Sequence, residues 1–576
     1  MESSAVVSNS EVAEVLMDIA VLLDMEGVKF KPRAYENAAR AIESLDRDVE
    51  EIYVEGGLDA LMEIPGVGES IAKKIEELLK TGHLKYYEDL KRQVPVNIES
   101  LASVEGLGPK TIKELYLQLG VKTLEDLEAA ARSGRIRGIP GFGVKREANI
   151  LRSIDALKSS RGRFLLGDVL TTVRSILHRF ESMSEVKAID VSGSVRRWKE
   201  TVGDVDFLVI SDQPAKVMDV FVSLPQVASV HSHGVTRSSV RLKSNMNADI
   251  RVIPEQSFGA ALQYFTGSKP HNIALRRIAI ARGWKLNEYG LFEGREQVAG
   301  ATEVDVYGKL GLQWIPPELR ENKGEIEAAQ QGKLPHLVEY SDVKGDLQVH
   351  TTWTDGTNSI ASMADEALKT GLEYIAITDH TKGLTVVHGL DEARIRTQMR
   401  EIDKLNRSLS GIQILKGCEV NIQRDGSLDL EDSALADLDI VGAAVHSYWT
   451  LPEAEQTERL IKVMENDNVD FIIHPTSREI GKRPPIQLDF YRIIQAAKDT
   501  DTILEIDSYP NRLDLKDDYV RRCVEAGVKL SIDTDAHARW QLHFREFGVA
   551  TARRGWATRD DIVNTRSVKD LLDMLK

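Results

Sequence analysis

The spacing of apolar residues divides the chain into a helical first part and a mixed later part. In residues 11–90 apolar side chains recur at helical spacing, as in 11-EVAEVLMDIAVLLDMEG. From about residue 163, strand-like runs such as 186-VKAIDVSG and 205-VDFLVI enter the pattern. We therefore predict helical domains first and a mixed α and β domain after them.

From residue 343 onward, short apolar strands alternate with helical segments, and the strands end in polar residues. Examples are 374-YIAITDH, 439-DIVGAAVH, 470-DFIIHP and 529-KLSIDTDAH. Alternation of this kind, with chemistry at the carboxyl ends of the strands, is typical of a parallel α/β barrel. The preceding segment, rich in proline and charge and without a strand period, is interpreted as a linker.

A short element occurs three times in the first part, as 64-IPGVGESIAKKI, 104-VEGLGPKTIKEL and 139-IPGFGVKREANIL. Each has a Gly-x-Gly turn before a helix start that carries Lys or Arg. Amides at such a helix start point toward an anion, which is how a helix-hairpin-helix element holds a DNA phosphate. One copy could be a tight turn alone, but the repetition favours DNA-backbone binding. The predicted contact residues are Gly66, Gly68, Gly106, Gly108, Lys110, Gly141, Gly143 and Lys145.

The charge distribution supports a polyanion partner although the 576-residue chain carries a net charge of −16. Residues 101–300 hold 29 basic and 21 acidic side chains, or +8, whereas residues 1–100 hold 11 and 21, or −10. The local sign matters more than the total. Two cysteines, Cys418 and Cys523, make no disulfide framework, and we see no membrane span or signal peptide. We expect a monomer in the cytoplasm, associated with the nucleoid through DNA.

Three aspartates form the first candidate for chemistry. Asp204 and Asp206 lie two apart on a predicted strand, so both carboxylates face one side, and Asp249 lies on another strand. Such carboxylates suit a pair of Mg²⁺ or Mn²⁺ ions. A solvated strand end would also show Asp-x-Asp. The nearby turn and cations, which could hold a triphosphate, favour nucleotidyl transfer; they are Gly193, Ser194, Arg196 and Arg197.

These motifs resemble the nucleotidyltransferase superfamily, and specifically the polymerase beta-like family X DNA polymerases. The run 264-YFTGSKPHNIALRRIAIARGWKLNEYGLF extends that resemblance. It implies that Asp249 accepts the proton of the primer 3′-hydroxyl. It also implies a nucleotide site in which Ser194 and Arg197 hold the triphosphate, and Tyr264, Phe265 and Gly267 line the sugar. Asn272 would contact the base edge and Arg276 the template side, and the site also includes Gly193 and Gly203. The family often has Arg where this chain has Asn247, so the tuning of Asp249 is expected to differ.

The head of the chain resembles the small lyase domain of the same family. Lys74 falls at the position of its Schiff-base lysine, and neighbouring cations would lower the pKa of such an amine. Ser70 and Asp48 stand where the resemblance implies lysines that grip a 5′-phosphate. A lyase activity and a purely structural or DNA-orienting Lys74 therefore both stay open.

Histidines and acids at successive strand ends form the second candidate. Mixed imidazole and carboxylate ligands suit Zn²⁺, Mn²⁺ or Fe²⁺. The set resembles a PHP domain (polymerase and histidinol phosphatase), which implies up to three metals and phosphoester hydrolysis: 3′→5′ exonuclease, abasic-site endonuclease or 3′-phosphatase. The implied ligands are His350, Asp355, His380, Glu419, His446, His474, Asp535 and His537.

Gln348 in 345-GDLQVHTTWTDG departs from the His-x-His of that family. A Gln carbonyl is a weaker ligand than imidazole for borderline metals. We expect a working phosphoesterase with one weakened metal site; the alternative is a decayed, structural module.

We thus predict a gap-filling DNA repair polymerase with a PHP phosphoesterase, acting on gapped or abasic DNA with deoxynucleoside triphosphates. A DNA-binding scaffold and an RNA nucleotidyltransferase are the rivals; the intact aspartates and the Tyr264–Phe265 pair argue against them. The predicted domains are a helical 8-kDa-like domain (1–92), a helix-hairpin-helix region (93–162), a nucleotidyltransferase palm (163–257), a thumb (258–318), a linker (319–340) and the seven-stranded PHP barrel (341–576).

Overall fold

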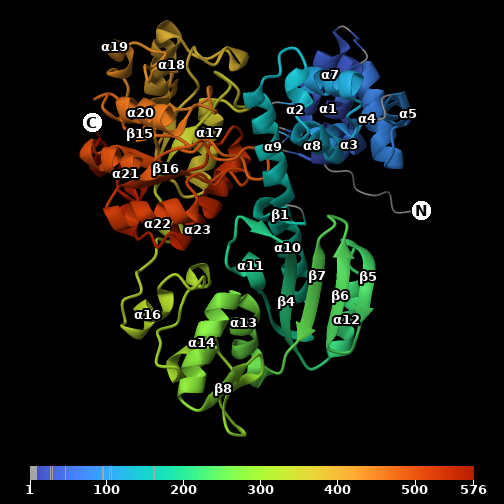
Figure 1. Cartoon of the computed structure of the whole chain (residues 1–576), viewed down its shortest axis with the longest axis vertical. Coiled ribbons are helices and arrows are strands. Elements are labelled where there is room, and N and C mark those ends of the chain that lie inside the picture. Colours follow the sequence, from blue (N-terminus) through green and yellow to red (C-terminus); the bar gives the residue numbers. More distant parts are fainter. Residues whose placement is uncertain are drawn as a thin grey trace. The chain divides into compact units, whose positions relative to one another are not determined.

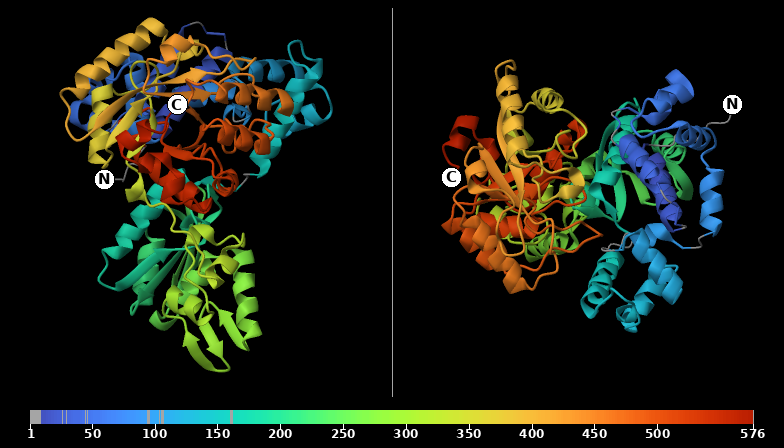
Figure 2. Two further views of the ribbon diagram at one scale, coloured as in Figure 1. Left: turned by 90° about the vertical axis from the view of Figure 1, so that its left-hand side faces the viewer. Right: turned by 90° about the horizontal axis from the view of Figure 1, so that it is seen from above.

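The computed structural model divides into two compact units (Figures 1 and 2). The first comprises residues 1–159 with 481–484, and the second comprises 160–480 with 485–576. The residues that the structure describes are 9–25, 27–28, 30–43, 45, 47–93, 96–102, 104, 107–159 and 162–575. Within these ranges no helix combines the length and apolarity needed to cross a membrane.

The described part of the first unit is helical, with one apolar core that runs from Val12 to Ile154. In two of its glycine turns the last glycine is the N-cap of the next helix. Gly68 precedes α4 and Gly108 precedes α7, and neither helix start has a side-chain capping hydrogen bond. The first-turn amides of these helices therefore point outward without a capping side chain. The helices are α1 (Asn9–Met25), α2 (Lys31–Glu43), α3 (Val49–Met62), α4 (Glu69–Thr81), α5 (Lys85–Gln93), α6 (Ile98–Ala102), α7 (Pro109–Leu119), α8 (Leu124–Arg132) and α9 (Val144–Ser159).

The second unit begins with a five-stranded sheet in the order β2-β4-β7-β6-β5. Its strands are β2 (Val186–Val191), β4 (Asp204–Ser211), β5 (Val227–His233), β6 (Arg237–Leu242) and β7 (Asn247–Val252). Along β4, Val205 and Phe207 join a core with α10 (Leu166–Glu181) and α12 (Pro214–Val222). Because strand side chains alternate, Asp204 and Asp206 face the opposite side.

The segment predicted as thumb packs helices against a small antiparallel sheet, β10-β9-β8. It contains α13 (Phe258–Thr266), α14 (Lys269–Ala281), β8 (Trp284–Asn287), β9 (Gly290–Glu293), β10 (Glu296–Ala299) and α15 (Glu303–Lys309). The segment predicted as linker carries α16 (Glu325–Gln330), and η3 (Pro317–Leu319) lies at its boundary with the predicted thumb. Ile326 and Ala329 of α16 are buried in the thumb core, so this segment is packed rather than extended.

The last part forms seven parallel strands in sequential order, β11 to β17, which confirms the predicted parallel α/β arrangement. The strands are β11 (Gly345–Val349), β12 (Tyr374–Ile377), β13 (Gln413–Asn421), β14 (Ile440–Ala444), β15 (Phe471–Ile472), β16 (Ile503–Asp507) and β17 (Leu530–Asp533). A parallel bridge between Val349 and Ala536 joins the first strand region to the last. The ring therefore nearly closes, and all seven strand ends open on one side.

Candidate active sites and DNA-binding elements

The three predicted aspartates lie on two neighbouring strands. Strands β4 and β7 run parallel with Asp206 directly opposite Asp249 and Asp204 opposite Asn247. Burial, followed by the charges of Asp204 and Asp249, raises the pKa of Asp206 to about 6. Three carboxylates crowded in this way repel one another until cations neutralise them, which fits a site for divalent ions.

The structure adds a cation that the sequence pattern did not single out. Arg237 on β6 donates from Nη2 to Asp249 Oδ2 at 2.8 Å, and Arg251 Nη2 lies 3.6 Å from the same oxygen. Asn247 instead accepts a hydrogen bond from Arg241. Position 247, where the resemblance implies an arginine, thus carries an asparagine, and the cations beside Asp249 are Arg237 of the next strand and Arg251. Only the β6–β7 pairing shows this, because Arg237 is 12 residues from Asp249 in sequence.

A tight turn borders the aspartates. Gly193 begins α11 (Gly193–Arg196) with a φ of 68°, a left-handed conformation that favours glycine, and a Cβ there would lie 3.7 Å from Asp206 Oδ2. Ser192 N–H donates to the Asp206 carbonyl at 2.8 Å, which holds the turn against β4. Arg163, which the sequence motifs did not indicate, lies next to Gly203: its Nη1 is 3.9 Å from the position that a Cβ on Gly203 would take.

The predicted nucleotide pocket lies at the end of α13. The Tyr264 and Phe265 rings pack edge to face with centroids 5.2 Å apart. Asn272 is buried and bonded within the protein: Nδ2 donates to the Tyr264 carbonyl at 2.7 Å, and Oδ1 accepts from Gln263. Arg276 is exposed. A base edge would therefore meet Asn272 only after these bonds change, whereas Arg276 is directly accessible.

Arg197 lies at the same pocket and is held by two contacts. Its Nε donates to Glu321 Oε1 at 3.1 Å, and Nη1 donates to the Thr266 carbonyl. A Cβ on Gly267 would come within 3.2 Å of Arg197 Nη1, so the glycine leaves room for the guanidinium. Arg196 Nη1 lies 2.8 Å from Glu303 Oε1 and also donates to the Thr266 hydroxyl at 2.9 Å. Both adjacent arginines therefore contact Thr266 at the end of α13, Arg196 through the hydroxyl and Arg197 through the carbonyl.

The predicted histidines and acids of the barrel converge around Glu419. His446 Nε2 and His474 Nε2 lie 2.9 and 3.0 Å from Glu419 Oε1. His380 Nδ1 and His350 Nε2 lie 3.1 and 3.3 Å from Oε2. Burial alone would raise the pKa of Glu419, but the imidazoles of His380 and His446 hold it well below its usual range. Glu419 is therefore a buried carboxylate surrounded by nitrogen ligands.

Three groups in the described residues have ligand atoms within 4.8 Å of one another: His350, Asp355, His380 and His537; His380, Glu419 and His446; and His350, Glu419 and Asp535. His474 contacts Glu419 but lies outside the group of His380, Glu419 and His446. Donor chemistry and geometry suit divalent metals, and His350 Nδ1, His474 Nδ1 and Gln348 Oε1 are buried without a hydrogen-bond partner.

Supporting residues orient this cluster. Asn421 Oδ1 lies 2.7 Å from His446 Nδ1, which leaves Nε2 to face Glu419. His474 and Asp535 have φ values of 29° and 51°, conformations that non-glycine residues adopt at a cost of about 1–3 kcal/mol each. Arg512, another residue missed by pattern, places Nε 3.8 Å from Asp535 Oδ2. These partners come from distant segments, so no local spacing predicts them.

Gln348 lies beside the cluster rather than far from it. Its Nε2 donates to Glu419 Oε2 at 3.1 Å and lies 3.4 Å from His350 Nε2. Its Oε1 is the buried acceptor without a partner. Because the two ends of the amide are exchangeable by rotation, the carbonyl oxygen can face the cluster when a cation is bound.

Lys74 is half-buried on α4, with Nζ 3.1 Å from Ser70 Oγ and 4.7 Å from the centre of the Tyr86 ring. Burial, followed by the charge of Lys31, lowers the pKa of Lys74. More of the amine is then neutral than for an exposed lysine, as a nucleophile requires.

The other predicted DNA-contact residues lie in three glycine turns of the first unit. Gly66 and Gly141 have φ values of 82° and 84°, as the turns demand. Lys145 is exposed. Gly106 and the side chain of Lys110 lie outside the described residues.

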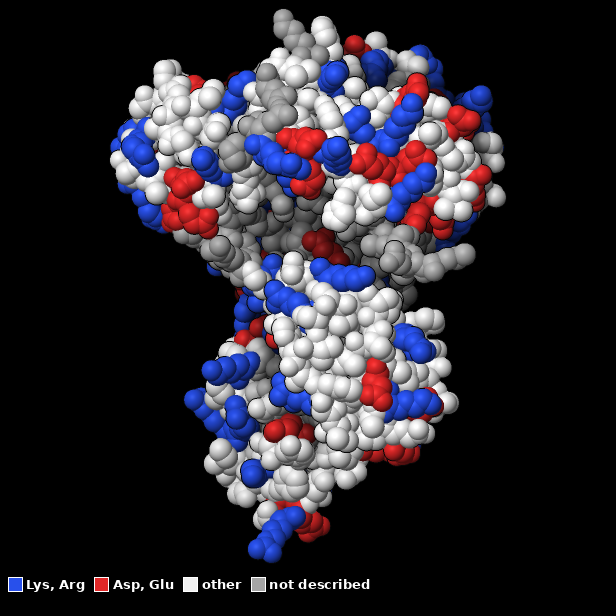
Figure 3. Space-filling model, turned by 90° about the vertical axis from the view of Figure 1, so that its right-hand side faces the viewer, with Lys and Arg blue, Asp and Glu red and all other residues white. Residues whose placement is uncertain are grey.

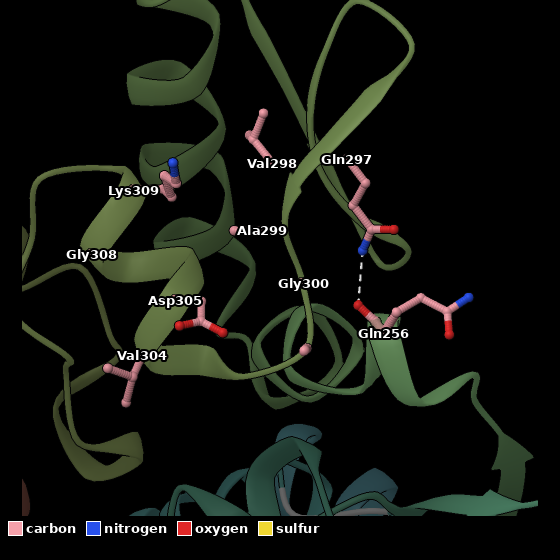
Figure 4. A pocket seen from close by; sticks show the side chains of 10 residues that line it. Gln256, Gln297, Val298, Ala299, Gly300, Val304, Asp305, Gly308 and Lys309 are labelled. Carbon is pink, nitrogen blue, oxygen red and sulfur yellow. Dashed lines mark hydrogen bonds between the residues drawn. The ribbon is translucent and has the colours of Figure 1, made fainter.

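The second unit also has a basic surface region and two cavities. Lys and Arg side chains gather along one side of the palm and thumb in the view of Figure 3, as a polyanion partner requires. A cavity of about 650 Å³ in the thumb is lined by Gln256, Gln297 and Lys309 among others (Figure 4). A second, of about 410 Å³, is lined by Arg237, Arg251 and Phe265 and adjoins the aspartates.

Comparisons with known proteins assign a class to four segments of the chain. Family profiles match a helix-hairpin-helix domain at residues 7–84, a SAM-like helix-hairpin-helix tandem at 98–156, a DNA polymerase beta thumb at 261–321 and a PHP domain at 346–546. The chain therefore combines family X polymerase modules with a metal-site barrel.

Over nearly its whole length the chain resembles one relative, the DNA polymerase/3′-5′ exonuclease PolX of Bacillus subtilis, with 38% identity over 571 residues (98% of this chain and 99% of that protein). The chain belongs to this PolX family. It is also 29% identical to DNA polymerase lambda of Rattus norvegicus over 54% of this chain and 56% of that protein. A probable phosphatase of Acetivibrio thermocellus is 30% identical over 34% of this chain and 80% of its own length.

Proposed function

We propose that the chain extends DNA 3′ ends at the palm aspartates and removes nucleotides in the 3′→5′ direction at the barrel centre. The direct pairing of Asp206 with Asp249 on adjacent parallel strands carries the first half. The convergence of four imidazoles on Glu419 carries the second half. Family membership and the matched modules support both.

In the palm, Asp204, Asp206 and Asp249 would hold two Mg²⁺ or Mn²⁺ ions. When bound, the ions supply charge compensation for the triphosphate and a clamp on its oxygens. Asp249 accepts the proton of the primer 3′-hydroxyl, and the hydrogen bond from Arg237 orients that carboxylate. Ser194 and Arg197 bind the triphosphate, and the Tyr264–Phe265 edge packs against the sugar.

In the barrel, the three ligand groups would hold Zn²⁺, Mn²⁺ or Fe²⁺, which when bound supply an activated hydroxide and grip the phosphate oxygens. Asn421 holds the tautomer of His446, and Arg512 supplies a positive charge beside Asp535 for the scissile phosphate. Gapped or abasic duplex DNA is the substrate of both centres, and deoxynucleoside triphosphates are the second substrate of the palm. Both centres belong to one chain, so the proposal requires no second copy.

The test follows a 5′-labelled primer on gapped duplex DNA with Mg²⁺ or Mn²⁺, with and without nucleotides. Wild-type protein should extend the primer with nucleotides and shorten it without them. Asp249→Asn should reduce extension by about 10³-fold or more and keep shortening; Glu419→Gln should do the reverse.

The matched substitutions remove one carboxylate charge each and keep the shape of the side chain. Loss of both activities in either variant would contradict two separate centres. Unchanged shortening by Glu419→Gln would remove the barrel assignment.

A further inference from the structure

The loop that follows α11 in the palm is held by the barrel. Three of the four residues 197–200 contact it. The Arg197 carbonyl accepts from Arg554 Nη1 at 2.8 Å, the Trp198 ring meets Phe547 edge-on with centroids 6.0 Å apart, and Glu200 Oε2 accepts from Arg478 at 2.8 Å. The fourth, Lys199, donates its N–H back to the Ser194 carbonyl at 3.0 Å. The backbone that presents Ser194 and Arg197 is therefore fixed from outside the palm.

Arg554 connects this loop to the charge that holds Arg197. It ends α23 (Arg545–Arg554), which packs against η3 on the side of the barrel that faces the palm (Figure 1). One nitrogen, Nη1, donates to the Arg197 carbonyl and lies 3.3 Å from Glu321 Oε1. The other, Nη2, pairs with Asp517 Oδ2 at 2.5 Å. Only 4% of the Arg554 side chain is exposed, so solvent screens these contacts weakly.

Glu321 is shared between the two arginines. Its Oε1 accepts from Arg197 Nε at 3.1 Å and from Arg554 Nη1 at 3.3 Å, and Lys199 Nζ lies 3.9 Å away. Burial alone would raise it, but Lys199, Arg554 and Arg197 hold the pKa of Glu321 below its usual range. Because Arg554 fixes the orientation of the Glu321 carboxylate, Glu321 in turn fixes the orientation of the Arg197 guanidinium.

From these contacts we propose that Arg554 of the barrel is a positioning residue for nucleotide addition in the palm: it holds the Arg197 backbone and, through Glu321, the direction of the Arg197 guanidinium. This inference rests on the proposed role of Arg197 in binding the triphosphate. If Arg554 has this role, the barrel contributes to nucleotide addition in the palm whether or not its own centre hydrolyses phosphoesters.

The experiment compares Arg554→Met with Arg553→Met in the full chain. Arg553, one residue earlier, makes a contact of the same kind: Nε donates to Glu318 at 2.7 Å and Nη1 to the Val338 carbonyl at 3.0 Å. Arg554→Met should raise KM for the nucleotide about tenfold and change kcat less than about threefold. Arg553→Met should leave both within about twofold, and exonuclease activity should stay within about twofold in both variants.

Two further variants separate the possible failures. Glu321→Gln should raise KM for the nucleotide, and combining it with Arg554→Met should add little, because both act through one contact. If Arg554→Met loses exonuclease activity as well, its fold is disturbed, and Glu321→Gln then decides the matter. Arg197→Met tests the underlying role: unchanged KM there would overturn the proposed function, not this contact alone.

Equal KM increases for Arg553→Met and Arg554→Met would overturn the inference and indicate general docking of the barrel. An unchanged KM in a folded Arg554→Met or in Glu321→Gln, beside a raised KM in Arg197→Met, would also overturn it.

Discussion

The palm and the barrel assemble acidic centres in different ways. The palm uses three carboxylates from two paired strands, and the register of β4 with β7 alone brings Asp206 opposite Asp249. The barrel gathers its candidate metal ligands from most of its strand ends, separated by up to 187 residues between His350 and His537. One centre depends on a single strand pairing, whereas the other depends on ring closure through the Val349–Ala536 bridge.

This difference teaches how each centre tolerates change. In the palm, position 247 carries Asn, and the neighbouring strand supplies Arg237 as the cation hydrogen-bonded to Asp249. In the barrel, one carboxylate, Glu419, contacts four imidazoles, so a change at the edge leaves other ligands in place. We therefore expect the largest loss of activity from substitutions at Glu419 or at Asn421, which orients His446, and the smallest change from substitution of Gln348.

The largest effect outside the ligands themselves should come from Asn421→Ala. Without the Asn421 carbonyl, His446 loses the partner that fixes its tautomer and ring. Removal of such support lowers metal affinity or activity by about 10–100-fold. Exonuclease rates and bound-metal content should both fall, and nucleotide addition should stay unchanged. A normal metal content would break the proposed link between Asn421 and the cluster.

A smaller effect is expected from Arg237→Met, which removes the cation beside Asp249. Nucleotide addition should fall by about tenfold, with the loss in kcat, because the carboxylate that takes the proton changes its charge environment. The matched variant is Arg241→Met, which removes an equal charge from the same strand but contacts Asn247. Comparable losses of nucleotide addition in the two variants would show that the positive charge of β6 affects the rate and that the specific contact with Asp249 does not.

The smallest effect should come from Gln348→His, which adds an imidazole to the group of His350, Glu419 and Asp535. Bound metal should rise, with exonuclease activity changing by about two- to fivefold and a weaker need for added Mn²⁺. Elemental analysis after dialysis, with activity over a Mn²⁺ series, measures both. Identical metal content and activity would show that position 348 contributes no ligand.

Much of this protein was predictable because its determinants are local. Strand alternation predicts that Asp204 and Asp206 face one side, and it requires only two residues of spacing. The repeated Gly-x-Gly turns predict helix starts, which the structure places after Gly68 and Gly108. The alternating pattern after residue 343 predicts parallel strands with ligands at their ends, because a right-handed crossover returns each strand in the same direction.

The partners of these residues were decided by tertiary structure alone. Arg237 reaches Asp249 through strand pairing, Asn421 reaches His446 across two strands, and Arg554 reaches Glu321 from 233 residues away. These contacts join segments that are far apart in the sequence and not related by helix or strand periodicity, so no spacing rule predicts them. The sequence by itself determined which chemistry each centre holds, because ligand types and strand ends are local properties. Only the folded chain decided what orients that chemistry, because orientation depends on side chains brought together by packing.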